Sequence, residues 1–464
     1  MFDIVFVDIP YINYEENNEL KKQMNLYRSE CDDIIRRKTG IDASEKQYFY
    51  SMGILCLSSF LKNYIRNIKV GYIHYHINFS LFEEYVKNTK VLAFSTMTVT
   101  FKKIVSLAYY AYSINPNIKI IMGGYHASFL AYDILKEYDI IDCIFLQEGE
   151  RSLLQYMLHL KKDSIQGIAF RKKDGEIIVN EFKEYLKGEE IPCPDYSLIQ
   201  EILPLFNIQL STMRGCAGAC RFCVNSSYWS LPRYIPIENI INELKYLKNH
   251  LKRGTVIHII DNIFTVNNQR LHELYVGMKE NNLLGYFHFE CDTLCKCVNR
   301  ESIKLLDKIG IFKICLGIED CEDPVLKIAG KGVSYSDNIK ASELIRKEAP
   351  NICIYTYWIL GLPGSSVKGL NNNIFQMRQL MENNIVDIIS PKIFIPYPGT
   401  YFYDHANDCG IKIISFDWDL YERRNPPFPY QYEHLTENEL YQYLMKAFRI
   451  CHNSYMRKFG SDLH

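Results

Sequence analysis

The first 160 residues alternate short apolar runs with longer stretches whose apolar residues recur at helical spacing. The short runs predict buried strands, and the helical spacing predicts helices at 52–64 and 101–113. Strands that alternate with helices form right-handed parallel units, so this region predicts a Rossmann-like parallel sheet. Ligands of such sheets bind beyond the carboxyl ends of the strands. The predicted strands are residues 2–8, 69–76, 91–98, 118–122 and 143–146.

A second strand–helix series begins at residue 208 and continues to about residue 400. Six units are too few for a closed eight-stranded barrel, so the pattern predicts a partial (β/α)6 barrel. Thr436 and Glu439 form a capping-box sequence, which predicts that a final helix covers 436–459. The strands expected in this series are residues 208–213, 256–261, 286–291, 313–318, 353–360 and 388–395.

These patterns predict an α/β chain of four parts. Residues 1–160 form the Rossmann-like domain and residues 204–400 form the partial barrel. Residues 161–203 contain a DGE hairpin signal and two nearby prolines, so we expect a connector there. Residues 401–464 are rich in Tyr and Phe and end in the predicted helix, so we expect them to cover the substrate. Their aromatic side chains favour a flat or apolar substrate group, although a peptide is also compatible.

Composition excludes several classes of protein. Lys and Arg total 53 and Asp and Glu total 54, a balance that argues against a nucleic-acid binder and against an anionic membrane surface. No apolar stretch is long enough to span a bilayer, and the N-terminal sequence lacks the basic flank of a secretory signal. The 15 cysteines are odd in number and lie in apolar segments, which indicates a reducing cytoplasm rather than a disulfide framework.

The strongest chemical signal is the CxxxCxxC spacing of Cys216, Cys220 and Cys223. Roughly 0.02 matches to this spacing are expected by chance in a chain of this cysteine content. Three buried thiols are one alternative, and zinc is another, but no fourth Cys or His follows within the next 25 residues. Three thiolates suit a [4Fe–4S] cluster that leaves one iron open to chelate an amino acid such as the methionine part of S-adenosylmethionine (SAM).

This loop, with Phe222 before its third cysteine and a six-unit series around it, resembles the radical SAM superfamily, and within it the cobalamin-binding subgroup. The resemblance covers almost the whole chain and implies a cluster, SAM and cobalamin as cofactors. It assigns the three cysteines to the cluster. The SAM contacts that it implies lie in the cysteine loop and in DNIFT, GIE and GLPG, namely Phe222, Asp261, Asn262, Glu319, Gly361 and Pro363.

In the first domain, the GGYH and EGE sequences resemble loops of B12-binding domains. The implied cobalamin contacts are Ser95, Gly123, Gly124, Tyr125, His126, Glu148, Gly149 and Glu150. Two family motifs are missing. The chain has no DxHxxG motif, so we expect no protein imidazole below the cobalt. It also has no GGE turn, so we expect the SAM amine contact to fall on Asp261 or Asn262.

Several of these residues have a plain structural alternative. His126 could be a loop histidine bonded to backbone, and Glu319 could be a helix N-terminal acid. Lys331 is expected to be a solvated charge beside a helix. Cys291, Cys295 and Cys297 match no common cluster loop and are expected to be structural or pocket thiols rather than ligands of an auxiliary metal.

The resemblance implies a class B-like methyltransferase of the cytoplasm, whose catalytic residues the sequence does not identify. One SAM is cleaved to a 5′-deoxyadenosyl radical that abstracts hydrogen from an unactivated carbon of a small-molecule or peptide substrate. The carbon takes its methyl from methylcobalamin, which a second SAM regenerates, and a flavodoxin or ferredoxin supplies electrons. A non-methylating rearrangement, cyclisation or oxidation is the alternative within the enzyme class. A binding protein with a structural cluster is the alternative outside that class.

Overall fold

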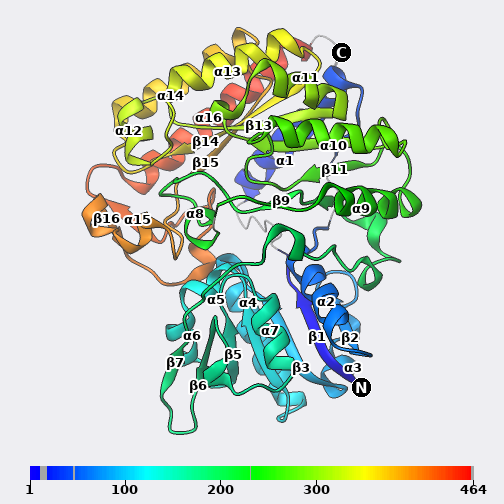
Figure 1. Ribbon diagram of the computed structural model, residues 1–464. Helices are drawn as coiled ribbons and strands as arrows, with labels where there is room; N and C mark the ends of the chain where they lie inside the picture. The colour runs from blue at the N-terminus through cyan, green and yellow to red at the C-terminus, as the bar shows by residue number, and fades with distance from the viewer. Residues whose placement is uncertain (11–17, 45–47, 230, 461–464) are drawn as a thin grey trace. The chain divides into compact units, whose positions relative to one another are not determined.

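The computed structural model describes residues 1–10, 18–44, 48–229 and 231–460 (Figure 1). The chain divides into two compact units. Unit 1 comprises Met1–Ile12, Lys46–Asn207 and Tyr228–Asn239, and unit 2 comprises Asn13–Glu45, Ile208–Ser227 and Ile240–His464. Each unit is built around its own sheet, and both sheets are flanked by helices (Figure 1).

Unit 1 contains a seven-stranded sheet of order β2-β1-β3-β4-β5-β6-β7. Strands β1 to β5 are parallel, whereas β6 and β7 add an antiparallel hairpin at one edge. The sheet strands are β1 (Phe2–Asp8), β2 (Val70–His74), β3 (Thr89–Ser95), β4 (Lys119–Gly123), β5 (Ile141–Phe145), β6 (Ile168–Arg171) and β7 (Ile177–Val179). The helices are α2 (Met52–Tyr64), α3 (Phe82–Lys87), α4 (Phe101–Ile114), α5 (Tyr125–Phe129), α6 (Ala131–Glu137) and α7 (Glu150–Met157), and the short β10 is Arg233–Tyr234.

Unit 2 contains a six-stranded sheet of order β15-β14-β13-β12-β11-β8, parallel throughout. Its strands are β8 (Ile208–Leu210), β11 (Val256–Ile259), β12 (His288–Thr293), β13 (Ile311–Glu319), β14 (Cys353–Leu360) and β15 (Ile388–Ile393). The helices between and after them are α9 (Ile237–His250), α10 (Asn268–Glu280), α11 (Arg300–Ile309), α12 (Asp323–Ile328), α13 (Tyr335–Glu348), α14 (Val367–Glu382), α15 (Tyr401–Asp404) and α16 (Glu437–Phe459). The remaining short elements are β9 (Met213–Arg214), α8 (Asn225–Tyr228), β16 (Ile411–Ile413) and β17 (Tyr430–Tyr432).

The predicted fold class is confirmed in both halves. The Rossmann-like sheet precedes a partial (β/α)6 barrel, and the chain ends in a helix whose capping box forms as expected. The Thr436 hydroxyl accepts a hydrogen bond from the Glu439 amide at 3.2 Å, while the Glu439 carboxylate accepts one from the Thr436 amide at 2.8 Å. No helix among the described residues is long and apolar enough to cross a membrane.

The structure groups two segments differently from the domain bounds expected above. Helix α1 (Asn18–Thr39) was not predicted, and it lies in unit 2 rather than with residues 1–160. It packs on α16 and on the barrel, where the Tyr27 hydroxyl donates to the Ile389 carbonyl at 2.7 Å and Tyr455 donates to Asp33 at 2.8 Å. The expected connector, 161–203, lies wholly within unit 1, because its hairpin extends the unit 1 sheet as β6 and β7.

Candidate functional site

The three-cysteine loop begins just beyond the carboxyl end of β8, the edge at which parallel sheets bind ligands. All three thiols are unpaired by disulfides, with Cys220 buried and Cys216 and Cys223 half-buried. Burial raises the pKa of Cys220 to about 11, although the positive charge of Lys331 acts in the opposite direction. A bound metal would favour the thiolates that this environment otherwise disfavours.

Asp261 fixes the strand from which the loop starts. Its carboxylate accepts hydrogen bonds from the amides of Thr212 and Met213, at 2.8 and 3.1 Å, and from the Thr212 hydroxyl. Burial raises the pKa of Asp261 to about 6, although these hydrogen bonds favour its charged form. Its neighbour Asn262 donates to the Gly215 carbonyl at 3.2 Å. Both residues therefore position the loop, and the Asp261 carboxylate is already engaged at both oxygens.

The far side of the loop is braced by two further elements. The Ser226 hydroxyl lies 2.7 Å from the Cys220 carbonyl and 2.6 Å from the Cys223 carbonyl. The Arg221 amide donates to the Ala329 carbonyl, at the end of α12, at 2.9 Å. These bonds hold the cysteine backbone before any cluster is present, which lowers the conformational cost of binding one.

A buried ion pair lies beside the loop. The Lys331 ammonium is 2.8 Å from Glu319, and the two side chains are only 3% and 8% exposed. Glu319 has a φ of 67° where the register of β13 and β14 shifts, an unusual conformation that directs its carboxylate toward Lys331. A Cβ on Gly317 would lie within 2.5 Å of both charged groups, so only glycine fits there. Describing Lys331 as a solvated charge is therefore wrong.

Across the described ranges of the chain, no three His, Cys, Asp or Glu side chains converge closely enough to hold one metal ion. Three cysteine thiolates are the protein ligands that a [4Fe–4S] cluster with one open iron requires. Cys295 is buried and Cys297 half-buried. Cys297 lies close enough to Cys216 for its pKa to be raised by that neighbour, after the larger effect of burial.

The GLPG turn follows β14 at the same end of the barrel. The Gly361 carbonyl accepts a hydrogen bond from the Tyr432 hydroxyl at 2.7 Å, and Gly361 faces Leu440 of α16. Pro363 is buried beside it. The structure thus brings Gly361, Glu319 and the cysteine loop to one edge, while the turn itself is packed against the C-terminal segment.

The GGYH turn of unit 1 follows β4 directly. Gly123 pairs with Ser95 of β3, and Gly124, with a φ of 90°, lies so close to β3 that a Cβ would be 2.7 Å from the Thr96 carbonyl oxygen. Tyr125 is half-buried, and its hydroxyl lies 3.0 Å from the indole nitrogen of Trp229. Sequence reasoning missed Trp229 and its neighbour Tyr228, because nothing local connects them to a loop a hundred residues earlier.

The remaining cobalamin candidates are more deeply placed. His126 is 1% exposed, and its ring centre lies 4.4 Å from that of Phe101 with the planes tilted by 44°. Its Nδ1 lies 3.2 Å from the Thr98 hydroxyl, and this geometry favours the structural alternative. Glu148 is buried and accepts hydrogen bonds from Arg233 and the Leu186 amide. Glu150 is buried at the start of α7, whose N-terminal cap is Gly149. The half-buried Ser95, Gly123 and Tyr125, with aromatic neighbours, fit a flat cofactor at the carboxyl edge of the unit 1 sheet.

A row of polar side chains lines the inner face of the barrel, and sequence reasoning missed it. His258 contacts Asp292 at 3.3 Å, Tyr357 donates to Asp292 at 3.2 Å, and Glu290 pairs with Lys313. His258 and Asp292 keep 34% and 30% of their side-chain surface accessible. Burial lowers the pKa of His258, but the hydrogen bond to Asp292 and the charge of Glu290 outweigh it and raise that pKa overall. The signal was available, because polar residues recur at every second position of β12.

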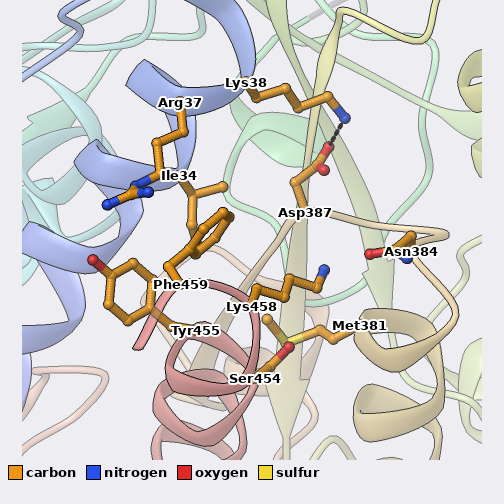
Figure 2. A pocket seen from close by; sticks show the side chains of 10 residues that line it. All are labelled: Ile34, Arg37, Lys38, Met381, Asn384, Asp387, Ser454, Tyr455, Lys458 and Phe459. Carbon is orange, nitrogen blue, oxygen red and sulfur yellow. Dashed lines mark hydrogen bonds and ion pairs between the residues drawn. The ribbon is translucent and has the colours of Figure 1, made fainter. Parts of the chain in front are cut away.

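A separate cavity of about 230 Å³ lies between α1, the end of α14 and the end of α16 (Figure 2). Asp387, which immediately precedes β15, accepts from Lys38 at 2.6 Å inside it, and Lys458 lies opposite (Figure 2). This cavity is at the amino ends of the strands, whereas the cysteines and Glu319 are at the carboxyl ends. It is therefore not the cofactor site.

Comparison with known proteins agrees with the geometry of both units. Residues 210–371 match the radical SAM superfamily and residues 39–156 match the B12 binding domain. An uncharacterized methyltransferase of Pyrococcus horikoshii is 25% identical over 74% of this chain and 74% of its own length. An anaerobic magnesium-protoporphyrin IX monomethyl ester cyclase of Cereibacter sphaeroides is 24% identical over 84% of this chain and 65% of its own.

Solved structures share the fold of the whole chain. The radical SAM methyltransferase TsrM from Kitasatospora setae, solved with cobalamin and a [4Fe–4S] cluster bound, superimposes with a TM-score of 0.66 at 12% identity. The match covers 92% of this chain and 84% of TsrM. Other relatives are longer, and the chain spans only 58% of a second cyclase and 55% of one solved enzyme. The chain thus has a B12-binding domain followed by a radical SAM domain, and the cofactors of these two domains are cobalamin, SAM and a [4Fe–4S] cluster.

Proposed function

We propose that this enzyme methylates an unactivated carbon of a small-molecule or peptide substrate. The observation that carries the proposal is the intact three-cysteine loop, which is braced at the carboxyl edge of a barrel whose inner face stays accessible. A cluster bound there would supply the electron for the reductive cleavage of SAM, and cobalamin bound to unit 1 would supply a methyl group.

The chain's own residues hold and orient the reactants. Cys216, Cys220 and Cys223 hold the cluster, and Asp261 keeps their strand in place. Glu319 and Lys331 form a buried polar pair beside Cys220, suited to the amino-acid part of SAM. Tyr125, Gly123 and Ser95 hold cobalamin in unit 1. Fixing the reactants in this way removes much of the entropic barrier to a reaction between them.

The alternative is a radical reaction without methyl transfer. The relative named a cyclase supports this alternative. We prefer methylation because the relative from Pyrococcus horikoshii is named a methyltransferase, and because cobalamin can provide a methyl group that a carbon radical accepts. Either reaction requires an outside electron donor, for which a flavodoxin or ferredoxin of the cytoplasm is suitable.

Anaerobic turnover with methyl-labelled SAM and candidate metabolites tests the proposal. We expect labelled product with 5′-deoxyadenosine and S-adenosylhomocysteine in about a 1:1 ratio, because one SAM cannot serve both roles. S-adenosylhomocysteine and product without 5′-deoxyadenosine would indicate polar methyl transfer. Unlabelled product with 5′-deoxyadenosine would establish the non-methylating alternative.

Cobalamin uptake tests the unit 1 assignment separately. EPR of the bound cob(II)alamin is expected to show no nitrogen splitting from a protein imidazole, since His126 is buried against Phe101. Splitting that disappears in His126→Ala would contradict this assignment of the lower face.

A further inference from the structure

Three lysines of unit 2 lie near the barrel, Lys313 and Lys392 on strands and Lys331 in the loop after α12, and two of them are paired. Lys313 forms an ion pair with Glu290, and Lys331 forms one with Glu319. The third, Lys392 of β15, forms no ion pair with any residue in the described part of the chain. It is half-buried among fully buried neighbours, and its ammonium lies 4.8 Å from the centre of the Tyr357 ring on the inner face.

Two arginines accompany Lys392 from the C-terminal segment. The Arg423 carbonyl accepts a hydrogen bond from the Ile393 amide at 2.8 Å, which places Arg423 and Arg424 next to Lys392. Both guanidinium groups lie close enough to repel the Lys392 ammonium. The Arg423 guanidinium lies 5.7 Å from the Tyr397 ring centre. Neither arginine forms an ion pair with a residue that the structure describes.

Arg424 has a buried hydrogen-bond donor that needs an acceptor. Its Nε–H is buried and has no hydrogen-bond partner among the described residues. A buried donor without an acceptor is costly, so folded proteins rarely keep one unless something else supplies the acceptor.

Two nearby acidic residues already form hydrogen bonds with other side chains. Asp292 bonds to His258 and Tyr357, and Glu319 bonds to Lys331. Glu422 lies beside the two arginines, and the more distant charges of Glu319 and Asp292 reach Lys392. Arg423 also lies within electrostatic reach of the Cys223 thiol. Three aromatic residues of the C-terminal segment are core, because Tyr421, Phe402 and Phe428 are at most 1% exposed. Others, such as Tyr401 and Phe416, remain exposed. The same segment also places two arginines beside Lys392.

From this unbalanced cluster we infer that Lys392, Arg423 and Arg424 bind an oxyanion group, a phosphate or carboxylate, of the substrate. The inference deepens the proposed function and rests on it only in taking the barrel interior as the substrate site. Guanidinium and ammonium groups are the side chains that bind such groups most strongly. A substrate without an anionic group would leave three cations desolvated, so the site selects against it.

Lysine acetylation of the reconstituted holoenzyme reports on this site without a known substrate. Burial, and then repulsion by Arg423 and Arg424, lower the pKa of Lys392 to about 7, so an isotope-labelled succinimidyl acetate reacts readily with it at neutral pH. An anion bound beside the amine raises its pKa and slows the reaction. Inorganic pyrophosphate and malonate serve as phosphate and carboxylate probes, and the exposed Lys412 is the internal control.

With SAM present, pyrophosphate or malonate is expected to slow acetylation of Lys392 about fivefold or more, since each unit of pKa rise removes most of the neutral amine. The better probe identifies the class of oxyanion. Arg424→Gln should abolish protection, Arg424→Lys should retain part of it, and Arg449→Gln on the exposed face of α16 should leave it unchanged. Protection by SAM alone, with no further effect of either probe, would assign the cluster to the SAM carboxylate and overturn the inference.

Equal acetylation of Lys392 and Lys412 with and without every probe would also overturn it. The iron content of the same wild-type sample and its release of 5′-deoxyadenosine report on the proposed function separately. A protein that cleaves SAM but ignores both anions therefore refutes only the oxyanion site.

Discussion

The sequence around Lys331 does not reveal that this residue is buried and paired with Glu319 in the fold. In the sequence, Lys331 stands between two glycines and looks like an ordinary surface charge. In the fold, both partners are almost completely buried, 2.8 Å apart, and Gly317 leaves room for them. Removing one partner leaves a buried charge uncompensated, which is far more costly than losing a surface ion pair.

We therefore expect Glu319→Gln to lower the free energy of unfolding by about 3–5 kcal/mol, because Lys331 then lacks its counter-ion. The double variant Glu319→Gln/Lys331→Met should recover most of the loss, since no buried charge remains. Urea unfolding of the cofactor-free proteins measures both. A single variant as stable as the wild type would mean that the pair is open to solvent.

His126 predicts a pH dependence of stability. Burial lowers its pKa to about 3, whereas the unfolded chain binds the proton near the ordinary value of 6.5. As the pH falls below 6.5, the unfolded chain therefore binds a proton at His126 before the folded protein does. This lowers the free energy of unfolding between pH 6.5 and pH 4, by up to about 3 kcal/mol.

The difference between wild type and His126→Leu, measured by urea unfolding at pH 7 and pH 4.5, isolates this contribution. His74, whose pKa burial lowers to about 4, and Asp8, whose pKa burial raises to about 6, are common to both proteins. If the two proteins lose stability in parallel, the His126 imidazole must be accessible after all.

At the scale of elements, the cysteine loop depends on the end of α12. The Ala329 carbonyl accepts from the loop, and a Cβ on Gly330 would lie 2.5 Å from the Ala219 carbonyl oxygen. Gly332 has the same φ of 68° but nothing within 4 Å of its Cβ position. The two glycines thus share the backbone strain of a substitution and differ only in the contact with the loop.

Gly330→Ala is expected to lower the iron and sulfide bound per chain after anaerobic reconstitution by more than half, because the loop must move away from α12. Gly332→Ala should bind a full complement, with only the loss of stability that a left-handed alanine imposes, about 1 kcal/mol. Equal cluster content in both variants would show that α12 does not position the loop.

The elements also show what sequence could predict. Strands β1 and β14 and helices α2 and α16 were predicted within a residue or so, because short apolar runs and caps are local signals. Helix α1 was missed because its polar sequence is stabilised by partners far along the chain, such as Ile389 and Tyr455. The three proposed cluster cysteines form a local spacing pattern that a sequence reveals. Lys392, Arg423 and Arg424 come together only through the pairing of residue 393 with residue 423, which no local pattern predicts.

At the scale of the whole molecule, we expect the two units to hold different cofactors. The proposed cluster ligands and the proposed oxyanion site belong to unit 2, and the proposed cobalamin contacts belong to unit 1. We expect Cys216→Ala, Cys220→Ala and Cys223→Ala each to abolish cluster assembly while cobalamin uptake continues. Cys295→Ala, which removes a buried thiol outside the motif, should assemble a full cluster. Iron, sulfide and cobalt analysis of the purified variants measures this separation.

Release of 5′-deoxyadenosine tests the central claim most directly. The reconstituted protein, reduced under anaerobic conditions with SAM, is predicted to release it even without substrate, and Cys220→Ala is predicted to release none. Mass spectrometry of the quenched mixtures quantifies it. A wild-type protein that carries four irons and four sulfides yet leaves SAM intact would contradict the account, as would a Cys220→Ala protein that still cleaves it.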